Sequence, residues 1–186
     1  MKYYIIAGEA SGDLYGSRLI DEIKSIDREA NIRFWGGDKM ILSGGFNVKH
    51  IKELAFMGFY EVLKNIFTIR KNINFCKKDI CDFDPDKIIY IDYPGFNLLI
   101  SKWAKKKGFK NYYYISPQIW AWKENRIKTI KENIDKLYVI FPFEREYYSD
   151  RHNLKSEFYA HPLIAHIDNF KTNFEFYKHN NIADEK

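Results

Sequence analysis

The stretch YYIIAGEASGD, residues 3–13, decides the fold prediction. Its apolar part predicts a buried strand over 2–7, and the glycine-rich turn that follows predicts the start of a helix over 13–26. In open α/β folds, a turn of this kind delivers side chains to the carboxyl edge of a sheet, where ligands bind. We therefore expect part of a functional site in residues 8–13.

Two carboxylates in this turn, Glu9 and Asp13, argue against a phosphate cradle, because an anionic side chain repels a pyrophosphate. The glycines at 8, 12 and 16 also differ in spacing from the dinucleotide pattern G-x-G-x-x-G. A carboxylate here can engage a hydroxyl group of a ligand instead. The alternative for Asp13 or Ser11 is a cap on the following helix, which does not explain Glu9.

Apolar runs and helical patterns alternate along the rest of the chain. Further strands are expected over 32–36, 46–51, 87–92, 111–115, 136–141 and 157–160. Further helices are expected over 57–82, 97–107, 119–133 and 143–151. This alternation predicts an α/β fold with a Rossmann-like, doubly wound, mostly parallel sheet. We expect one domain over 1–168, followed by a polar linker over 169–186.

The composition of the 186 residues narrows the function only slightly. A formal charge of +5 is compatible with a nucleic acid, an anionic membrane surface or a phosphorylated ligand, and favours none of them. Cys76 and Cys81 have no histidine nearby, so we expect ordinary thiols and no metal site. The first apolar run is too short for a signal peptide, and no segment reaches the length of a membrane span, so we expect a cytoplasmic protein.

A second edge site is expected at Asp92, which follows the apolar run 88–91 and precedes a Pro-Gly turn. A carboxylate at the end of a parallel strand is partly desolvated, which raises its pKa and suits it to act as a general base. Asn97 lies five residues later in the same motif. The alternative is that Asp92 only forms the turn or caps the next helix.

A third site follows the strand expected over 111–115, in the string SPQIWAW at 116–122. Trp120 and Trp122 are two residues apart and cannot share one helical face, so at least one is expected to line a cleft. Sugar rings and nucleobases both stack on such side chains, and core packing is the alternative. His161 follows the last expected strand and is expected to face the same cleft.

The helix expected from residue 57 onward has a wide apolar surface between 57 and 75. One stripe contains Val62, Ile66, Ile69 and Ile73, and a second contains Phe59, Tyr60, Leu63 and Phe67. Together they cover about half of the circumference, more than a surface helix needs for its core-facing side. Lys64 and Lys71 lie at the outer edge and Arg70 lies inside it, as in interfacial membrane helices. The alternative is a helix that protein covers on two sides.

Six strings, in this order, resemble the lipid-A-disaccharide synthase family. They are AGEASGD at 7–13, ELAFMGFYEVL at 53–63, DYPGFN at 92–97, SPQIWAW at 116–122, FPFE at 141–144 and HPL at 161–163. The resemblance implies the acceptor-side, amino-terminal half of a GT-B-type glycosyltransferase with two Rossmann-like halves. It also implies an inverting transfer that needs no metal or other cofactor.

The resemblance implies substrates and site residues as well. Diacylglucosamine would pass from its UDP carrier to lipid X (diacylglucosamine 1-phosphate), in lipid A biosynthesis. Glu9 and Asp92 match positions required for activity in the family, with Asp92 as the expected general base. Substrate contacts are expected from Ser11, Asp13, Asn97, Gln118, Trp120, Trp122 and His161. Membrane contacts are expected from Phe59, Tyr60, Leu63, Phe67 and Arg70.

These expectations place the protein at the cytoplasmic face of the inner membrane, with no nucleic-acid partner. A homodimer is one arrangement open to the full-length enzyme. The sequence departs from the family at Ala160, where a glycine is usual before His-Pro. The family's glycine- and arginine-containing segment that grips UDP is not among these 186 residues, so little transferase activity is expected from them alone. The alternatives are another sugar-nucleotide enzyme, such as an epimerase, and a non-catalytic membrane-binding module.

Overall fold

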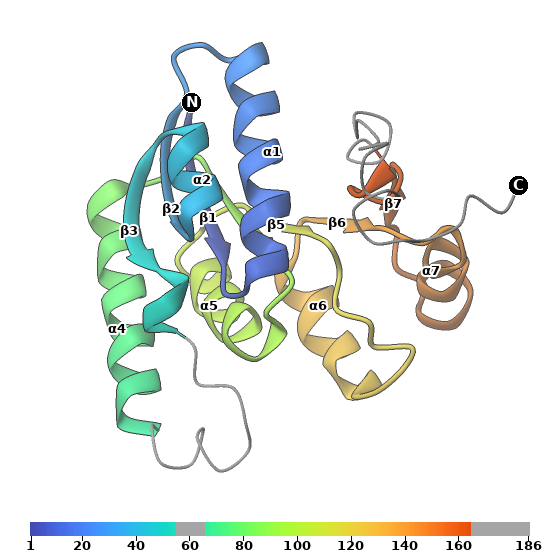
Figure 1. Cartoon of the computed structure of the whole chain (residues 1–186). Helices are drawn as coiled ribbons and strands as arrows, with labels where there is room; N and C mark the ends of the chain where they lie inside the picture. The colour runs from blue at the N-terminus through green and yellow to red at the C-terminus, as the bar shows by residue number, and fades with distance from the viewer. Residues whose placement is uncertain (55–65, 165–186) are drawn as a thin grey trace, which may run out of the picture.

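The computed structural model describes residues 1–54 and 66–164, which form a seven-stranded parallel sheet with helices on both faces (Figure 1). The strands are β1 (Lys2–Ala7), β2 (Asn31–Gly36), β3 (Phe46–His50), β4 (Lys87–Ile91), β5 (Asn111–Tyr114), β6 (Lys136–Val139) and β7 (Glu157–Phe158). The α-helices are α1 (Ala10–Ile26), α2 (Asp38–Ser43), α4 (Ile66–Phe83), α5 (Pro94–Lys106), α6 (Ile127–Asn133) and α7 (Pro142–Glu146). Short helical turns are η1 (Ile51–Glu53), η2 (Glu124–Arg126) and η3 (Tyr147–Arg151).

The strand order is β3-β2-β1-β4-β5-β6-β7, and every pair in the described sheet is parallel. The chain therefore winds in one direction from β1 to β3 and in the other direction from β4 to β7. The reversal lies between β1 and β4, where Ala7 is paired with Ile91. The α/β, doubly wound, parallel fold predicted from the sequence is confirmed.

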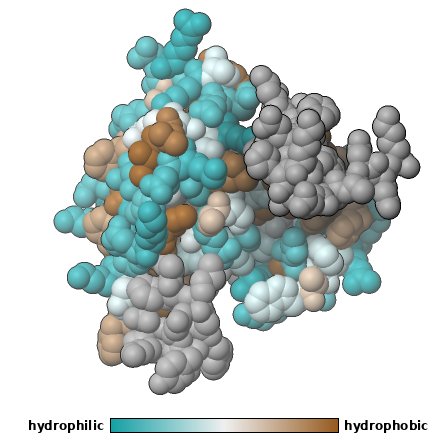
Figure 2. Space-filling model, viewed as in Figure 1, coloured by the Kyte–Doolittle hydropathy of each residue, from teal (hydrophilic) through white to brown (hydrophobic). Residues whose placement is uncertain are grey.

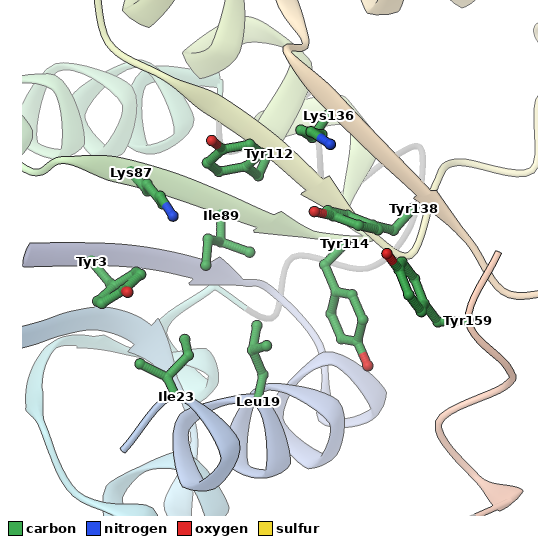
Figure 3. A pocket seen from close by; sticks show the side chains of 10 residues that line it. All are labelled: Tyr3, Leu19, Ile23, Lys87, Ile89, Tyr112, Tyr114, Lys136, Tyr138 and Tyr159. Carbon is green, nitrogen blue, oxygen red and sulfur yellow. The ribbon is translucent and has the colours of Figure 1, made fainter. Parts of the chain in front are cut away.

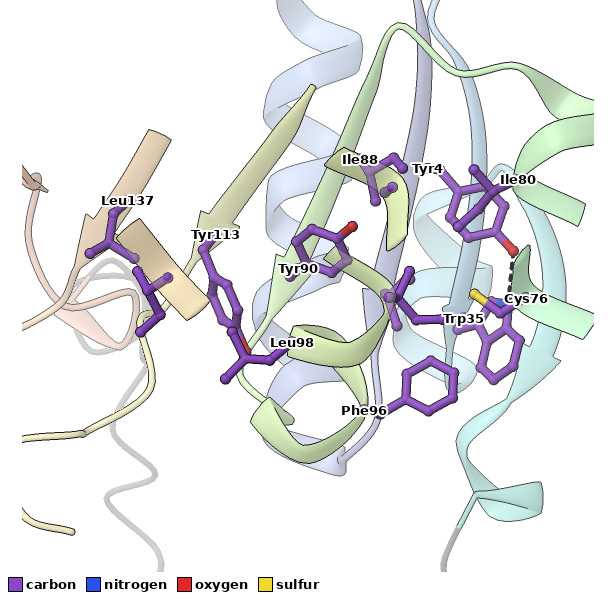
Figure 4. Packing of buried hydrophobic residues seen from close by; sticks show 14 of the residues in the cluster. Tyr4, Trp35, Cys76, Ile80, Ile88, Tyr90, Phe96, Leu98, Tyr113 and Leu137 are labelled. Carbon is purple, nitrogen blue, oxygen red and sulfur yellow. Dashed lines mark hydrogen bonds between the residues drawn. The ribbon is translucent and has the colours of Figure 1, made fainter. Parts of the chain in front are cut away.

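Alternate side chains of each strand point to opposite faces of the sheet, which produces two separate cores. Tyr4 and Ile6 of β1 belong to the larger core, and Tyr3 and Ile5 belong to the smaller one. The larger core also contains Trp35, Cys76, Ile80, Tyr90, Phe96 and Tyr113, which come from β2, α4, β4, α5 and β5 (Figure 4). The smaller core lies against α1 and α2, through Ile20 and Met40.

Polar groups inside the larger core are paired. The indole N–H of Trp35 donates to the Tyr4 hydroxyl at 2.9 Å (Figure 4). That hydroxyl donates to the Asp79 carboxylate at 2.9 Å. The same carboxylate pairs with the Arg33 guanidinium at 2.7 Å. Because each buried donor has an acceptor, this chain of contacts joins β1, β2 and α4 without an unpaired polar group.

Asp13 has a role that the sequence analysis did not predict. Its carboxylate accepts the backbone N–H groups of Gly37 (2.7 Å), Lys39 (3.1 Å) and Met40 (3.0 Å), which are the free donors at the start of α2. The side chain is buried, with 5% of its surface exposed. Both of its oxygens therefore cap α2, a helix other than the one it belongs to, and the substrate contact expected from Asp13 stays a prediction.

Two other expected elements differ from the structure. The helix expected over 119–133 begins only at Ile127, after an irregular loop over 116–123 and the short turn η2. The helix expected over 57–82 is described from Ile66, as α4. Its first part, like the linker expected over 169–186, lies outside the described residues.

We predict that Asp13→Ala lowers the free energy of unfolding by at least about 2 kcal/mol, because three N–H groups at the start of α2 lose their acceptor. Urea unfolding followed by circular dichroism measures this loss. The matched control is Asp21→Ala, an exposed position on the same helix α1, which should change stability far less. Equal losses in the two variants would contradict the capping role.

Candidate active site

Glu9 and Asp92 lie where the strand order reverses, at the carboxyl edge of the sheet. Glu9 precedes α1, and its side chain makes no capping hydrogen bond. Asp92 follows β4 directly, and both side chains are half-buried. Burial raises the pKa of Glu9, and the negative charge of Asp92 raises it further. The two carboxylates are thus close enough to interact, at the position where open α/β sheets bind ligands.

Asp92 has the electrostatics of a base. Burial raises the pKa of its carboxyl group, while the backbone N–H of Tyr93 and the positive charge of Arg126 lower it in part. The net upward shift makes this carboxylate more basic than one in water. A carboxylate with a raised pKa is suited to take a proton from a hydroxyl group.

The backbone at Asp92 is strained and firmly held. Asp92 and Tyr93 have φ values of 42° and 48°, in the left-handed region that non-glycine residues seldom adopt. The carbonyl oxygen of Asp92 accepts hydrogen bonds from the Tyr113 hydroxyl and from Nδ2 of Asn97, both at 2.7 Å. Such strain persists only where surrounding contacts enforce it, and it is concentrated at functional sites.

Asn97 holds the backbone at the carboxyl ends of β1 and β4. Its side chain is fully buried, and Nδ2 also lies 3.5 Å from the carbonyl oxygen of Ile6 in β1. It thereby links the ends of β1 and β4. Nδ2 of Asn97 thus donates to backbone carbonyls, whereas Oδ1 is buried without a hydrogen-bond partner, and the substrate contact stays a prediction.

Gly8 is required by the close approach of an aromatic ring. A Cβ atom at this position would lie 2.3 Å from Cγ of Tyr93. The Tyr93 ring stacks on Phe96, with ring centroids 5.6 Å apart, so the ring is supported from α5. Burial and the charge of Glu9 raise the pKa of the Tyr93 hydroxyl. The ring therefore forms part of the cleft wall beside Glu9.

The loop over 116–123 is anchored at Trp120. Its indole N–H donates to the carboxylate of Glu144 at 3.0 Å, and its ring packs edge-on against Phe143 at 5.0 Å. Ile119, one residue earlier, is buried. Trp122 is 59% exposed and makes no such anchor. Trp120 thus holds the loop although it is partly exposed, and Trp122 is the more exposed of the two tryptophans.

The remaining expected contacts are placed around the same edge. Ser11 and Gln118 are exposed. The His161 ring lies 6.1 Å from the Tyr15 ring of α1 and 5.7 Å from the Phe141 ring that follows β6, so it joins the two sides of the edge. Ala160 has a φ of 125°, a backbone conformation that suits glycine better than alanine. Glycine is also the residue expected at this position from the resemblance to the lipid-A-disaccharide synthase family.

The sequence analysis missed Arg126, Tyr93 and Tyr113. Arg126 lies at the end of η2, and its charge lowers the pKa of both Asp92 and Tyr113. A helix expected through 119–133 gives no reason to place this residue near Asp92. Tyr93 lies inside the DYPGFN motif, directly after Asp92, so its place in the sequence could have marked it as a residue of the site.

No cluster of three or more His, Cys, Asp or Glu side chains that could hold a metal is present in residues 1–54 and 66–164. A groove of about 490 Å³ does exist, on the face of the sheet next to α1 (Figure 3). Its lining residues are Tyr3, Leu19, Ile23, Lys87, Ile89, Tyr112, Tyr114, Lys136, Tyr138 and Tyr159. Neither Glu9 nor Asp92 lines it, so it is separate from the candidate active site.

The expected membrane contacts are described only in part. Phe67 is 83% exposed and Arg70 is exposed, both in the first turns of α4. Ile73, in the other stripe, packs against the larger core. Phe59, Tyr60 and Leu63 lie outside the described residues. No helix in the described part of the chain is long and apolar enough to cross a membrane.

We predict that Gly8→Ala destabilises the protein by about 1–3 kcal/mol, because the new methyl group overlaps the Tyr93 ring. In a double-mutant cycle with Tyr93→Ala, much of this loss should disappear. Gly95→Ala is the matched control, since a Cβ atom there meets nothing within 4 Å. Additive losses in the cycle, measured by chemical denaturation, would show that the ring does not require Gly8.

Comparison with known proteins agrees with this geometry. A family model described as lipid-A-disaccharide synthetase matches residues 3–186. The chain is 41% identical over 159 residues to the lipid-A-disaccharide synthase of Coxiella burnetii (strain Dugway 5J108-111), and 42% identical over 163 residues to that of Geobacter metallireducens. These matches cover 86% and 88% of this chain and 42% of each relative, so the chain spans less than half of the relatives' length.

Among solved structures, the UDP-GlcNAc 2-epimerase from Neisseria meningitidis bound to UDP-GlcNAc matches with a TM-score of 0.64. The match covers 96% of this chain and 52% of the epimerase, at 10% identity, so it concerns the fold alone. The family model, in contrast, extends over nearly the whole sequence and includes both carboxylates of the cleft. The chain therefore belongs to the lipid-A-disaccharide synthetase family.

Proposed function

We propose that this chain is the acceptor-side part of a GT-B-type glycosyltransferase. The enzyme would transfer diacylglucosamine from UDP-diacylglucosamine to lipid X, forming the β(1–6) lipid A disaccharide and releasing UDP. The observation that supports this best is the pair Glu9 and Asp92 at the reversal of strand order, in a chain of the lipid-A-disaccharide synthetase family. Because the chain spans 42% of its relatives, we assign donor binding to the part of the enzyme that these residues do not include.

Asp92 is the proposed general base. As the acceptor hydroxyl attacks the anomeric carbon of the donor, the Asp92 carboxylate takes the hydroxyl proton. The bond from that carbon to the UDP oxygen breaks, and UDP leaves with the bonding electrons. A single displacement of this kind inverts the anomeric centre, and no metal step is needed for the proton transfer. The raised pKa of Asp92 increases its strength as the proton acceptor.

Glu9 is the proposed orienting group. Its carboxylate faces the same cleft and makes no capping hydrogen bond, so its oxygens can accept hydrogen bonds from the acceptor sugar. Burial raises the pKa of Glu9, and the negative charge of Asp92 raises it further, which supports a shared role for the two carboxylates. A hydroxyl held between them would be directed toward Asp92 at a short distance.

Phe67 and Arg70 support a peripheral position on the cytoplasmic face of the inner membrane. Exposed aromatic and basic side chains on one helix are typical of interfacial helices. The rest of the visible surface is mainly hydrophilic, with separate hydrophobic spots (Figure 2). We propose that the first turns of α4, together with residues 59, 60 and 63, form the membrane contact.

We predict that Phe67→Ser weakens binding to anionic phospholipid vesicles about tenfold or more, since burying one large apolar side chain contributes about 1.5–3 kcal/mol. Co-sedimentation with vesicles measures this binding. Leu42→Ser is the matched control, because Leu42 is 87% exposed on α2, close to the 83% of Phe67. Equal weakening in both variants, or none in either, would remove α4 from the proposed contact.

We predict that Asp92→Asn lowers turnover about 10²–10⁴-fold in the protein joined to its donor-binding part, because the amide cannot accept the proton. The melting temperature should stay the same or rise. A carboxyl whose folded pKa is raised costs stability above its unfolded pKa, and at neutral pH the amide removes that cost. A lower melting temperature with unchanged turnover per folded molecule would assign Asp92 to the structure only.

A further inference from the structure

Beyond the two carboxylates, the same edge of the sheet has a cluster of positive charge around Trp122, in the loop that follows β5. The Lys123 ammonium lies 4.3 Å from the centroid of the Trp122 ring, and the Arg126 guanidinium carbon lies 5.3 Å from it. We name Trp122, Lys123 and Arg126 the Trp122 cluster. It combines a large aromatic surface, exposed to solvent, with two cations of different geometry.

The Trp122 cluster is held in place by its surroundings. Trp120 fastens the preceding loop to Glu144, and Arg126 leads directly into α6. Lys123 has φ of 57°, a left-handed conformation that surrounding contacts must enforce in a lysine. The two cations are therefore presented by a constrained turn and not by a freely moving loop.

Neither cation has an ionic partner within the described residues. No ion pair within 4 Å joins Lys123 or Arg126 to a carboxylate of residues 1–54 or 66–164. The nearest acidic residue in sequence, Glu124, is engaged by the Tyr147 hydroxyl at 2.9 Å and by His152 at 3.3 Å. The charge on Arg126 does reach Asp92, whose pKa it lowers. The loop that carries the cluster follows β5, in which Tyr114 pairs with Ile91, the residue before Asp92, so the cluster and the proposed base lie at the same edge of the sheet. The Arg126 guanidinium is therefore available to an anion at that edge.

We propose that the Trp122 cluster is a subsite for a sugar phosphate, and that it holds the phosphate of the acceptor beside Asp92. This inference rests on the proposed function, because it takes the molecule next to the base to be the acceptor. The guanidinium matches two phosphate oxygens at once, and the ammonium adds a point charge. Both cations pack over the indole ring, which holds the two positive charges close together.

Such a subsite would determine which hydroxyl reacts. The phosphate and the attacking hydroxyl are attached to different carbons of one ring, so an anchor on the phosphate fixes where the hydroxyl lies. Arg126 and Lys123 would make the phosphate a requirement for productive binding. The rival ligand with the same chemistry is the diphosphate of UDP, and the experiment below separates the two.

Binding to the ¹⁵N-labelled 186-residue chain tests the proposal directly. The probe is glucosamine 1-phosphate, followed through the indole N–H signal of Trp122, which Trp122→Phe identifies. We expect Arg126→Gln to weaken binding at least about tenfold, and Lys123→Gln to weaken it by a smaller factor. Lys128→Gln, an exposed position in the first turn of α6 and two residues after Arg126, is the matched control and should bind as the unchanged chain does.

Three further probes decide what is recognised. Glucosamine without phosphate should bind at least about tenfold more weakly to the unchanged chain, and inorganic phosphate should bind more weakly than the sugar phosphate. Tighter binding of UDP than of glucosamine 1-phosphate would assign the subsite to the donor and overturn the proposal. Equal binding of glucosamine 1-phosphate to Arg126→Gln and to the unchanged chain, with both folded by circular dichroism, would also overturn it.

Kinetics of the protein joined to its donor-binding part provide the second test. Arg126→Gln should raise KM for lipid X at least about tenfold with a smaller effect on kcat, and should leave KM for the dephosphorylated acceptor unchanged. Transfer that is unaffected by Arg126→Gln would overturn the subsite and leave the proposed function standing. Absence of transfer in the unchanged enzyme, with sugar phosphate still bound at Trp122, would overturn the proposed function instead.

Discussion

The parallel pairing of β1 with β4 is the constraint on which the rest of the structure depends. These strands are adjacent in the sheet although α1, β2, α2, β3 and α4 separate them in the chain. After β1 the chain continues to β2 on one side of this pair, and after β4 it continues to β5 on the other side. The two connections therefore diverge, and the carboxyl ends of β1 and β4 stay accessible to a ligand. Asn97 reinforces this edge by donating to the carbonyl groups of Ile6 and Asp92. The position of the candidate site is therefore set first by the order of the strands, and the side chains at this edge then determine its chemistry.

The groups at this edge are unfavourable for stability and suitable for chemistry. Two half-buried carboxylates lie at the same edge of the sheet, and the backbone at Asp92 and Tyr93 is left-handed. The two apolar cores, and the hydrogen bonds from Tyr113 and Asn97, offset this cost. Local departures of this kind from the rules of stable folding are expected where a protein positions reactive groups.

The strands could be predicted from the sequence because their apolar runs are local signals. Elements that depend on distant contacts could not. The helix α2 begins where Asp13, 24 residues before Gly37, supplies the acceptor for its free N–H groups. The loop before α6 is irregular because Trp120 binds Glu144, 24 residues later, so the apolar pattern over 119–133 misled the prediction. Such contacts become visible only when the sheet brings the two segments together.

The same limit applies within the site. Glu9 and Asp92 could be found because each follows an apolar strand, yet Asp13 and Asn97 stand in the same motifs and serve the scaffold. One motif therefore contains residues that suit the chemistry and residues that hold the backbone. Only the hydrogen bonds seen in the structure distinguish the two groups. Backbone groups use both carboxylate oxygens of Asp13 and Nδ2 of Asn97, whereas Oδ1 of Asn97 is buried without a hydrogen-bond partner. Glu9 makes no capping hydrogen bond, and Arg126 packs over Trp122 without an ion pair to the described residues. We therefore assign substrate binding to these two side chains, whose polar groups remain available to a ligand.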